Sequence, residues 1–164
     1  MTTALVRTRL ATDHDVAAVL ELYNRCSGQA RESRFHAPVQ RVSRRLVEQL
    51  VLPHQGWSIV AEQGDDLVGH ACAGPLSPTA VEVALLVDDA VQGSGIGTRL
   101  LRELVTSATD RGFESLVCSV EPHNVAMPAT VRRAGLTGTS SYVDGTVEIV
   151  VPLATAVLAE RQPA

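Results

Sequence analysis

The most regular hydrophobic pattern of the chain lies in residues 81–112. Residues 81–87, VEVALLV, are apolar except for Glu82, a composition that predicts a strand buried on both faces of a sheet. A glycine-rich segment follows, and apolar residues then recur at the spacing of one helix face, at Leu100, Leu101, Leu104, Val105 and Ala108. Gly112 stands where a helix C-terminus favours a residue that adopts positive φ. The stretch therefore predicts a strand, a glycine-rich turn and a helix.

Upstream of this unit, the pattern predicts a strand and two helices. Residues 5–10 form the strand, and Thr12 starts a T-x-x-D capping box for a helix over residues 13–24. Ser43 caps a second helix whose inner positions are apolar. Residues 25–42 are expected to be irregular, and their arginines either are solvated or form an acceptor rim for a substrate with acidic flanks. These arginines are Arg25, Arg31, Arg34 and Arg41.

The remaining elements are a hairpin, a strand, a helix and a second hairpin. In chain order they are expected over residues 57–73, 115–120, 125–134 and 136–153, and the last hairpin turns at Asp144-Gly145. Such a mixed order predicts an α/β or α+β sandwich with a partly antiparallel sheet. We expect one domain over residues 1–153, followed by a C-terminal tail or the start of a linker over residues 154–164.

Composition and charge narrow the class of protein. The 164 residues are 45% hydrophobic but only 3% aromatic, so aliphatic side chains must fill the core. No run approaches the roughly 20 apolar residues of a membrane span. The net charge of -4 gives no reason to expect nucleic acid as a partner, and the chain contains no lysine. The N-terminus, MTTALVRTRL, lacks the long apolar region of a signal peptide, so we expect a cytoplasmic protein without a membrane partner.

Three widely spaced cysteines fit reduced thiols better than a disulfide framework. They are Cys26, Cys72 and Cys118. The last two lie in apolar runs, where we expect small core side chains. His70 also lies in an apolar run and is expected to be an interior histidine with a hydrogen-bond partner. No C-x-x-C or H-x-x-x-H spacing occurs, so we expect no metal site.

The glycines of residues 93–98 indicate a site for a pyrophosphate. The first turn of a helix carries backbone N–H groups without intrahelical partners, and their dipoles favour anions. Glycines let the backbone approach an anion closely, because no Cβ intervenes. The spacing G-x-G-x-G differs from the dinucleotide-binding G-x-G-x-x-G and from the P-loop motif. A glycine-rich loop without a ligand is the alternative for this segment taken alone.

The segment resembles the Q/R-x-x-G-x-G/A signature of the GNAT superfamily of acyl-CoA-dependent N-acyltransferases. The matching residues are Gln92, Gly93, Ser94, Gly95, Ile96 and Gly97. A second motif, from Asn124-Val125-Ala126-Met127 to Gly135-Leu136, resembles the family's N-x-x-A…G-F helix, and the element order is similar over residues 5–153. Within the superfamily, the chain is similar to bacterial protein lysine acetyltransferases. That pattern is echoed by Glu82-Val83-Ala84, by Asn124-x-x-Met127 and by Ser33-Arg34-Phe35.

The resemblance implies a GNAT-like mixed α/β (α+β) fold with a partly antiparallel central sheet, flanked by about four helices. The strand at 81–87 would splay from the strand at 115–120, and pantetheine would lie in the resulting V. The pyrophosphate would bind the glycine-rich segment, with acetyl-CoA as cosubstrate and no metal. The cofactor-binding residues that the resemblance implies are Leu86, Val87, Gln92, Gly93, Ser94, Gly95, Ile96, Gly97, Thr98 and Asn124.

The resemblance also implies a catalytic role for Glu82. A lysine ammonium group has a pKa of about 10.4, so the amine must lose a proton before it attacks a thioester. A carboxylate beside the thioester suits this step, and a matching glutamate acts as the general base in the lysine acetyltransferases. The alternative is a strand-edge glutamate that points to solvent. Glu121 and His123, just past a strand end, are weaker candidates for assisting the reaction.

Two residues depart from the family's pattern. Val131 stands where many members carry a tyrosine that acts as a general acid, so we expect CoA to leave as the thiolate, whose pKa is about 8.5. Ser94 stands where arginine or lysine is common, so the loop would hold phosphate mainly through N–H groups.

These observations predict transfer of an acetyl group from acetyl-CoA to the ε-amine of a protein lysine by direct attack. The alternatives are an N-acetyltransferase for a small-molecule amine and a non-catalytic acyl-CoA-binding sensor. The presence of Glu82 argues against the sensor, whereas the missing tyrosine favours it.

Overall fold

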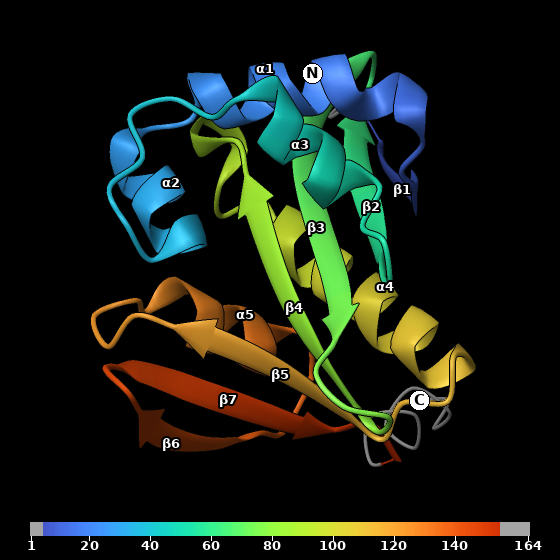
Figure 1. Ribbon diagram of the computed structural model, residues 1–164, viewed down its shortest axis with the longest axis vertical. Coiled ribbons are helices and arrows are strands. Elements are labelled where there is room, and N and C mark those ends of the chain that lie inside the picture. Colours follow the sequence, from blue (N-terminus) through green and yellow to red (C-terminus); the bar gives the residue numbers. More distant parts are fainter. Residues whose placement is uncertain (1–4, 155–164) are drawn as a thin grey trace.

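Seven strands form one sheet in the computed structural model, which describes residues 5–154 (Figure 1). The strand order is β1-β2-β3-β4-β5-β7-β6. The strands are β1 (Val6–Leu10), β2 (Trp57–Gln63), β3 (Asp66–Pro75), β4 (Ala80–Val87), β5 (Ser115–Val120), β6 (Thr139–Val143) and β7 (Thr146–Pro152). Neighbouring strands are antiparallel except β4 and β5, which are parallel. The predicted mixed, partly antiparallel sheet is therefore confirmed.

Five α-helices within residues 5–154 cover the two faces of this sheet. They are α1 (Val16–Arg25), α2 (Gly28–Phe35), α3 (Arg44–Val51), α4 (Ile96–Asp110) and α5 (Ala126–Arg133), with short 3-10 turns η1 (Asp13–Asp15) and η2 (Asp89–Val91). The helix α4 packs on β3, β4 and α5, whereas α1, α2 and α3 lie on the other face (Figure 1). No helix in this part of the chain has both the length and the apolarity to cross a membrane.

The helix α2 is one more than the sequence predicts. Residues 25–42 are expected to be irregular, which is wrong for Gly28–Phe35. Ser27 caps this helix, because its Oγ accepts a hydrogen bond from the Ala30 N–H at 3.1 Å. None of the α2 residues is fully buried, so the helix lacks the continuous apolar stripe from which helices are predicted.

Several predicted boundaries shift by a few residues. The helix expected over residues 13–24 begins with η1 and continues as α1, after the predicted capping box at Thr12. The strand expected to start at residue 136 starts at Thr139. The predicted tail or linker over residues 154–164 lies outside the described residues, except for Ala154.

Aliphatic side chains fill the core on both faces of the sheet, as predicted. Under α4, the buried side chains include Leu100, Leu101 and Leu104, each fully inaccessible. Under α1 and α3, a second cluster includes Val19, Leu22, Tyr23 and Val47. The two clusters hold the helices to the sheet by burial of apolar surface, which is the main stabilising contribution in a fold of this kind.

The strands β4 and β5 separate soon after they meet. They pair only from Ala80–Glu82 to Ser115–Val117, and beyond this point they diverge toward α2 and α5 (Figure 1). The predicted splayed pair is therefore confirmed. The expectation that residues 81–87 are buried on both faces is wrong, because Glu82 is exposed and Ala84 and Leu85 are half-buried. These side chains border the space between the two strands.

Candidate active site

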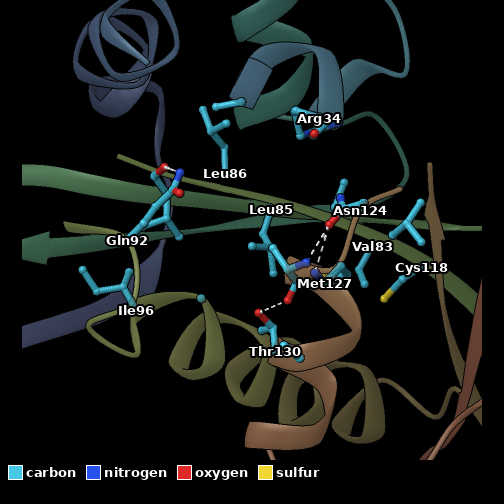
Figure 2. Close-up of a pocket in the computed structure, with 18 of the residues that line it drawn as sticks. Arg34, Val83, Leu85, Leu86, Gln92, Ile96, Cys118, Asn124, Met127 and Thr130 are labelled. Atoms are coloured by element: carbon cyan, nitrogen blue, oxygen red, sulfur yellow. Dashed lines mark hydrogen bonds between the residues drawn. The ribbon is translucent and has the colours of Figure 1, made fainter. Parts of the chain in front are cut away.

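A cavity of about 940 Å³ occupies the opening between β4 and β5. Its walls come from α2, β4, the segment over residues 91–98, the end of β5, and α5. Figure 2 shows Arg34 of α2 and Thr130 of α5 on opposite sides of this cavity, with Leu85 of β4 between them. Glu82 and nine of the ten predicted cofactor-binding residues line it, and Ser94 is the exception.

The glycine-rich segment presents backbone groups rather than side chains to the cavity. Gly93 and Gly95 have φ of 80° and 90°, the left-handed region that glycine adopts without strain. Gly95 leads directly into α4, whose first turn includes the cavity-lining residues Ile96, Gly97 and Thr98. The free N–H groups of this turn favour an anion, so the geometry suits the predicted pyrophosphate site.

Polar side chains of this segment are used to hold the loop itself. The Ser94 Oγ donates to the Val91 carbonyl oxygen at 2.5 Å, which explains why Ser94 does not line the cavity. The Gln92 Nε2 donates to the Val87 carbonyl oxygen at 3.2 Å and to Asp89 Oδ1 at 3.3 Å. Gln92 therefore ties the loop to the end of β4.

Asn124 holds the start of α5 through its side chain. Its Oδ1 accepts hydrogen bonds from the backbone N–H groups of Ala126 at 3.0 Å and Met127 at 3.1 Å (Figure 2). The side chain also lines the cavity, opposite β4. Its carbonyl oxygen is thus engaged with α5, which leaves the Nδ2 amide as the group able to donate to a ligand.

Glu82 lies at the vertex of the V. It is the last β4 residue that pairs with β5, opposite Val117. Its Oε1 accepts a hydrogen bond from the Ser119 Oγ at 3.0 Å, and both residues line the cavity. The carboxylate is therefore oriented by one neutral donor and remains accessible to a molecule in the cavity.

Two other predicted candidates lie near the end of β5. His123 Nε2 is 3.4 Å from Glu121 Oε2, and only His123 lines the cavity. The His123 side chain is 73% exposed, whereas that of Glu121 is 15% exposed. Cys118 lines the cavity as well, but burial, with a smaller effect of the nearby Glu82 charge, raises the pKa of its thiol to about 12. The thiol is therefore protonated and unreactive near neutral pH.

The arginines of residues 25–42 are not simply solvated. Arg25 Nε is 2.6 Å from Asp88 Oδ2, and Arg31 donates to the carbonyl oxygens of Val39 and Cys26. Arg34 lines the cavity and contacts the phenol of Tyr23 and the thiol of Cys72. The solvated alternative is wrong for Arg31 and Arg34, which are half-buried, whereas Arg25 and Arg41 are exposed as that alternative predicts.

Cys72 and His70 are both expected in the interior, and the structure confirms this only for His70. Cys72 is half-buried at the cavity and contacts Arg34, so the prediction of a core side chain is wrong for it. His70 is fully buried, and its Nδ1 lies 3.1 Å from the Tyr23 hydroxyl, which confirms an interior histidine with one hydrogen-bond partner, while its Nε2 is buried without a partner among the described residues. Burial, and then the charge of Arg34, lower the pKa of His70 to about 3, so this imidazole is neutral.

Several lining residues have no counterpart among the sequence predictions. They are hydrophobic or small and come from both arms of the V: Val83, Leu85, Val91, Met127 and Thr130. For Val83 and Leu85 the signal is their place on β4 beside the gap, which the sequence alone does not locate, whereas Val91 lies on η2 and Met127 and Thr130 lie on α5. Within residues 5–154, no group of three or more His, Cys, Asp or Glu side chains is arranged to hold a metal ion.

Comparison with known proteins connects this geometry to a family. Residues 11–136 match the model of the acetyltransferase (GNAT) family. The GNAT domain of S. lividans PAT is similar, with a TM-score of 0.80 and 27% identity, over 88% of this chain and 89% of that chain. The ribosomal-protein-alanine N-acetyltransferase from Brucella melitensis has a TM-score of 0.67 and 25% identity, over 88% and 97% of the two chains.

A third structure shares the fold at lower identity. The aminoglycoside acetyltransferase AAC(6')-Ib in complex with coenzyme A has a TM-score of 0.74 and 21% identity, over 96% of this chain and 100% of that chain. No curated protein gives a significant sequence match. The family model spans most of the chain and both arms of the V, and the chain therefore belongs to the GNAT family of acetyltransferases, which transfer acyl groups from acyl-CoA to amines.

Proposed function

We propose that this acetyltransferase transfers the acetyl group of acetyl-CoA to the ε-amine of a lysine in a protein. The observation that carries the proposal is the position of Glu82, a carboxylate at the vertex of the V that lines the cavity. A protein acceptor, though not lysine in particular, is also supported by the 25% identity to the Brucella enzyme, whose name describes an alanine of a ribosomal protein as the acceptor. The pattern around Glu82 and Asn124, which resembles that of bacterial lysine acetyltransferases, adds to this support.

In this proposal, acetyl-CoA lies between the two arms of the V. Its pyrophosphate binds the backbone N–H groups of residues 93–98 at the start of α4. Its pantetheine arm follows β4 near Leu86 and Val87, where β5 no longer pairs with that strand. Asn124 faces this arm from the other wall, with its Nδ2 free to donate. The thioester then lies near Glu82.

The reaction needs one proton acceptor and one leaving group. The Glu82 carboxylate takes one proton from the lysine ammonium, and the free amine then attacks the thioester carbonyl carbon. A C–N bond forms, the C–S bond breaks, and the second proton of the nitrogen passes to water. The Ser119 hydroxyl holds Oε1 of that carboxylate. Val131, buried in α5, offers no proton, so CoA leaves as a thiolate with a pKa of about 8.5.

The acceptor class is tested by thiol release. Acetyl-CoA is incubated with the protein alone, with lysine-containing peptides, or with small amines that include an aminoglycoside. We expect release of free CoA with the peptides and an acetyl group on their ε-amines. Because the chain has no lysine, the intact mass of the enzyme should gain no acetyl group on an ε-amine.

The other outcomes separate the alternatives. Release with small amines alone would contradict the lysine acceptor. Tight binding of acetyl-CoA without release to any amine would indicate a sensor. An acetyl adduct on serine or threonine of the peptide would mean O-acylation and would contradict the reaction class.

A further inference from the structure

A polar cluster lies on the α2 side of the cavity. We call it the Arg34 cluster, and it consists of Tyr23, Arg34, His70 and Cys72. The Arg34 Nε donates to the Tyr23 hydroxyl at 3.2 Å, and its Nη2 donates to the Cys72 Sγ at 3.0 Å. Tyr23 in turn contacts the His70 Nδ1 at 3.1 Å. The guanidinium also lies over the Phe35 ring, 5.1 Å from its centroid, so Arg34 is fixed on several sides.

The groups around Arg34 carry no negative charge that would balance it. Burial raises the pKa of Tyr23 to about 12 and lowers that of His70 to about 3, so both are neutral near pH 7. None of the ion pairs formed by residues 5–154 includes Arg34. A guanidinium that is partly withdrawn from water without an opposite charge is costly to the fold.

Arg34 still has donors to offer. A guanidinium carries five N–H groups, and the contacts to Tyr23 and Cys72 use two of them. The residue lines the cavity, and Figure 2 shows it on the wall above Val83 and Asn124. The planar fork of the guanidinium matches a carboxylate, which it binds through two parallel hydrogen bonds. An anion in the cavity is therefore the partner that this arrangement lacks.

The register of the sheet places Cys72, which Arg34 contacts, relative to Glu82. Cys72, the contact of Arg34, pairs with Ala84, and Glu82 lies two residues earlier on the same face of β4. Two residues of a strand span about 7 Å. An acceptor whose amine lies at Glu82 therefore extends along this face toward Arg34.

We propose that Arg34 binds a carboxylate of the acceptor whose amine is acetylated at Glu82. This inference rests on the proposed transfer of acetyl to a lysine, and it narrows the acceptors to lysines beside an acidic residue. The α-carboxylate of a free or C-terminal lysine is a second source of the same chemistry. An aminoglycoside, which carries several ammonium groups and no carboxylate, lacks the group that Arg34 recognises.

The test compares matched substrates in the wild-type enzyme. The peptides are acetyl-Gly-Lys-Asp-Gly-amide, the same peptide with Asn in place of Asp, and acetyl-Gly-Lys with a free C-terminal carboxylate. Free lysine is the fourth substrate. We expect kcat/KM to be about 10-fold to 100-fold higher for the Asp peptide than for the Asn peptide, mostly through KM, as for a hydrogen bond to a charged group. Equal values for these two peptides would overturn the proposal.

Two variants assign the preference to Arg34. In Arg34→Gln, kcat/KM for the Asp peptide should fall to the value for the Asn peptide. The value for the Asn peptide should itself change little. A purely structural role of Arg34 would lower both peptides by the same factor, and that result would overturn the proposal. Arg41→Gln removes the same charge from an exposed position and should preserve the ratio.

The remaining substrates separate this inference from the proposed function. A faster reaction with free lysine, or with the peptide that ends in lysine, than with the Asp peptide would support carboxylate binding by Arg34. It would identify the α-carboxylate of lysine as the group that is bound. Acetylation of small amines without any lysine substrate would contradict the lysine acceptor instead. The pair γ-aminobutyrate and γ-aminobutyramide then tests Arg34 by itself, and equal rates for that pair would overturn it.

Discussion

The two walls of the cavity present different groups to a ligand. The loop wall, residues 91–98, presents the backbone of two left-handed glycines and the first turn of α4. The α2 wall presents side chains, namely Arg34 and Cys72, together with Glu82 on the exposed face of β4, while Tyr23 and His70 lie buried behind them. The loop wall suits a phosphate whatever the rest of the ligand is, whereas the α2 wall selects by charge and position.

Because of this difference, different substitutions should abolish binding at each wall. A backbone site depends on φ angles, so it tolerates changes of side chain and is lost when a glycine is replaced. A side-chain site depends on groups that converge from several elements, so single substitutions remove its chemistry and leave the fold intact. Variants of the two walls should therefore affect acetyl-CoA binding and acceptor turnover separately.

The largest effect is expected at Glu82. Glu82→Gln keeps the size of the side chain and removes its basicity, so kcat should fall about 10²–10⁴-fold. Affinity for acetyl-CoA, measured by calorimetry, should change little because the loop wall is untouched. The residual rate should rise toward pH 10, where the free amine no longer needs a base.

Glu121→Gln is the matched control for this substitution. Glu121 lies beyond β5, pairs with His123, and does not line the cavity. The control should retain kcat if Glu82 is the base. A near-normal kcat in Glu82→Gln at neutral pH, with a low kcat in Glu121→Gln, would transfer the role to the Glu121–His123 pair.

A change at the loop wall should instead remove the cofactor. A Cβ at Gly95 meets no atom within 4 Å, but φ is 90°, so Gly95→Val costs about 1–3 kcal/mol in backbone strain or displaces the loop. Acetyl-CoA at 100 times its Kd should stabilise the wild type by about 2.7 kcal/mol, and this gain should disappear in the variant. Thermal unfolding with and without acetyl-CoA measures both effects.

Gly112→Val separates strain from binding. Gly112 follows the other end of α4 with φ of 84°, also has open space around its Cβ position, and does not line the cavity. The free energy of unfolding of Gly112→Val should fall by an amount comparable to that in Gly95→Val. Acetyl-CoA should still stabilise Gly112→Val as much as it stabilises the wild type. Equal gains in Gly95→Val and Gly112→Val would contradict the assignment of the loop wall as the phosphate site.

The loop wall was predictable because its information is contiguous. The spacing of Gly93, Gly95 and Gly97 and the helical pattern that follows lie within one stretch of sequence, and a positive φ is what glycine permits. Ser94 is the exception within that stretch, because its hydroxyl turns back to Val91. Glu82 could also be found, since it is the one charge in an apolar strand.

Arg34 and Glu82 could be named from the sequence, but the contacts that join the Arg34 cluster could not, because its members come from separate elements. Tyr23 lies on α1, Arg34 on α2, and both His70 and Cys72 on β3, so only the tertiary fold brings them together. The helix α2 has no buried residue that would mark its inner face. Its one local signal is Ser27, a good N-cap residue, which by itself does not distinguish a helix from a turn.

The buried polar cluster should make the α2 wall sensitive to acid. The pKa of His70 is about 3 in the fold, against about 6.5 in an unfolded chain. Above pH 6.5 the imidazole is neutral in both states, but below it only the unfolded chain takes up the proton. The free energy of unfolding should therefore fall as the pH drops from 6.5 toward 3, by about 2 kcal/mol at pH 5.

Denaturant unfolding at pH 7 and pH 5 measures this loss. In His70→Gln, which keeps a hydrogen-bonding group beside Tyr23, the loss should be smaller by the same amount. Asp15 does not interfere in this window, because its hydrogen bond with Arg9 lowers its pKa to about 2 and stabilises the fold until the pH falls below about 3.8. An unchanged pH dependence in His70→Gln would contradict a neutral buried imidazole.

The smallest effect is expected at Ser94, where the loop wall has no charged side chain. Ser94 is exposed. Within residues 5–154, the only hydrogen bond of its hydroxyl is the one to the Val91 carbonyl oxygen. Ser94→Arg adds a cation beside the proposed pyrophosphate site, and exposed charge pairs contribute about 0.2–1 kcal/mol, so Kd for acetyl-CoA should fall about 1.4-fold to 5-fold. The gain in affinity should shrink as salt rises from 0.05 M to 0.5 M, because exposed charges are screened.

Ser94→Ala is the control for this substitution. It removes the hydroxyl without adding charge and should leave Kd and its salt dependence nearly unchanged. If Ser94→Arg and Ser94→Ala bind acetyl-CoA equally at low salt, the phosphates do not lie on the loop wall near Ser94.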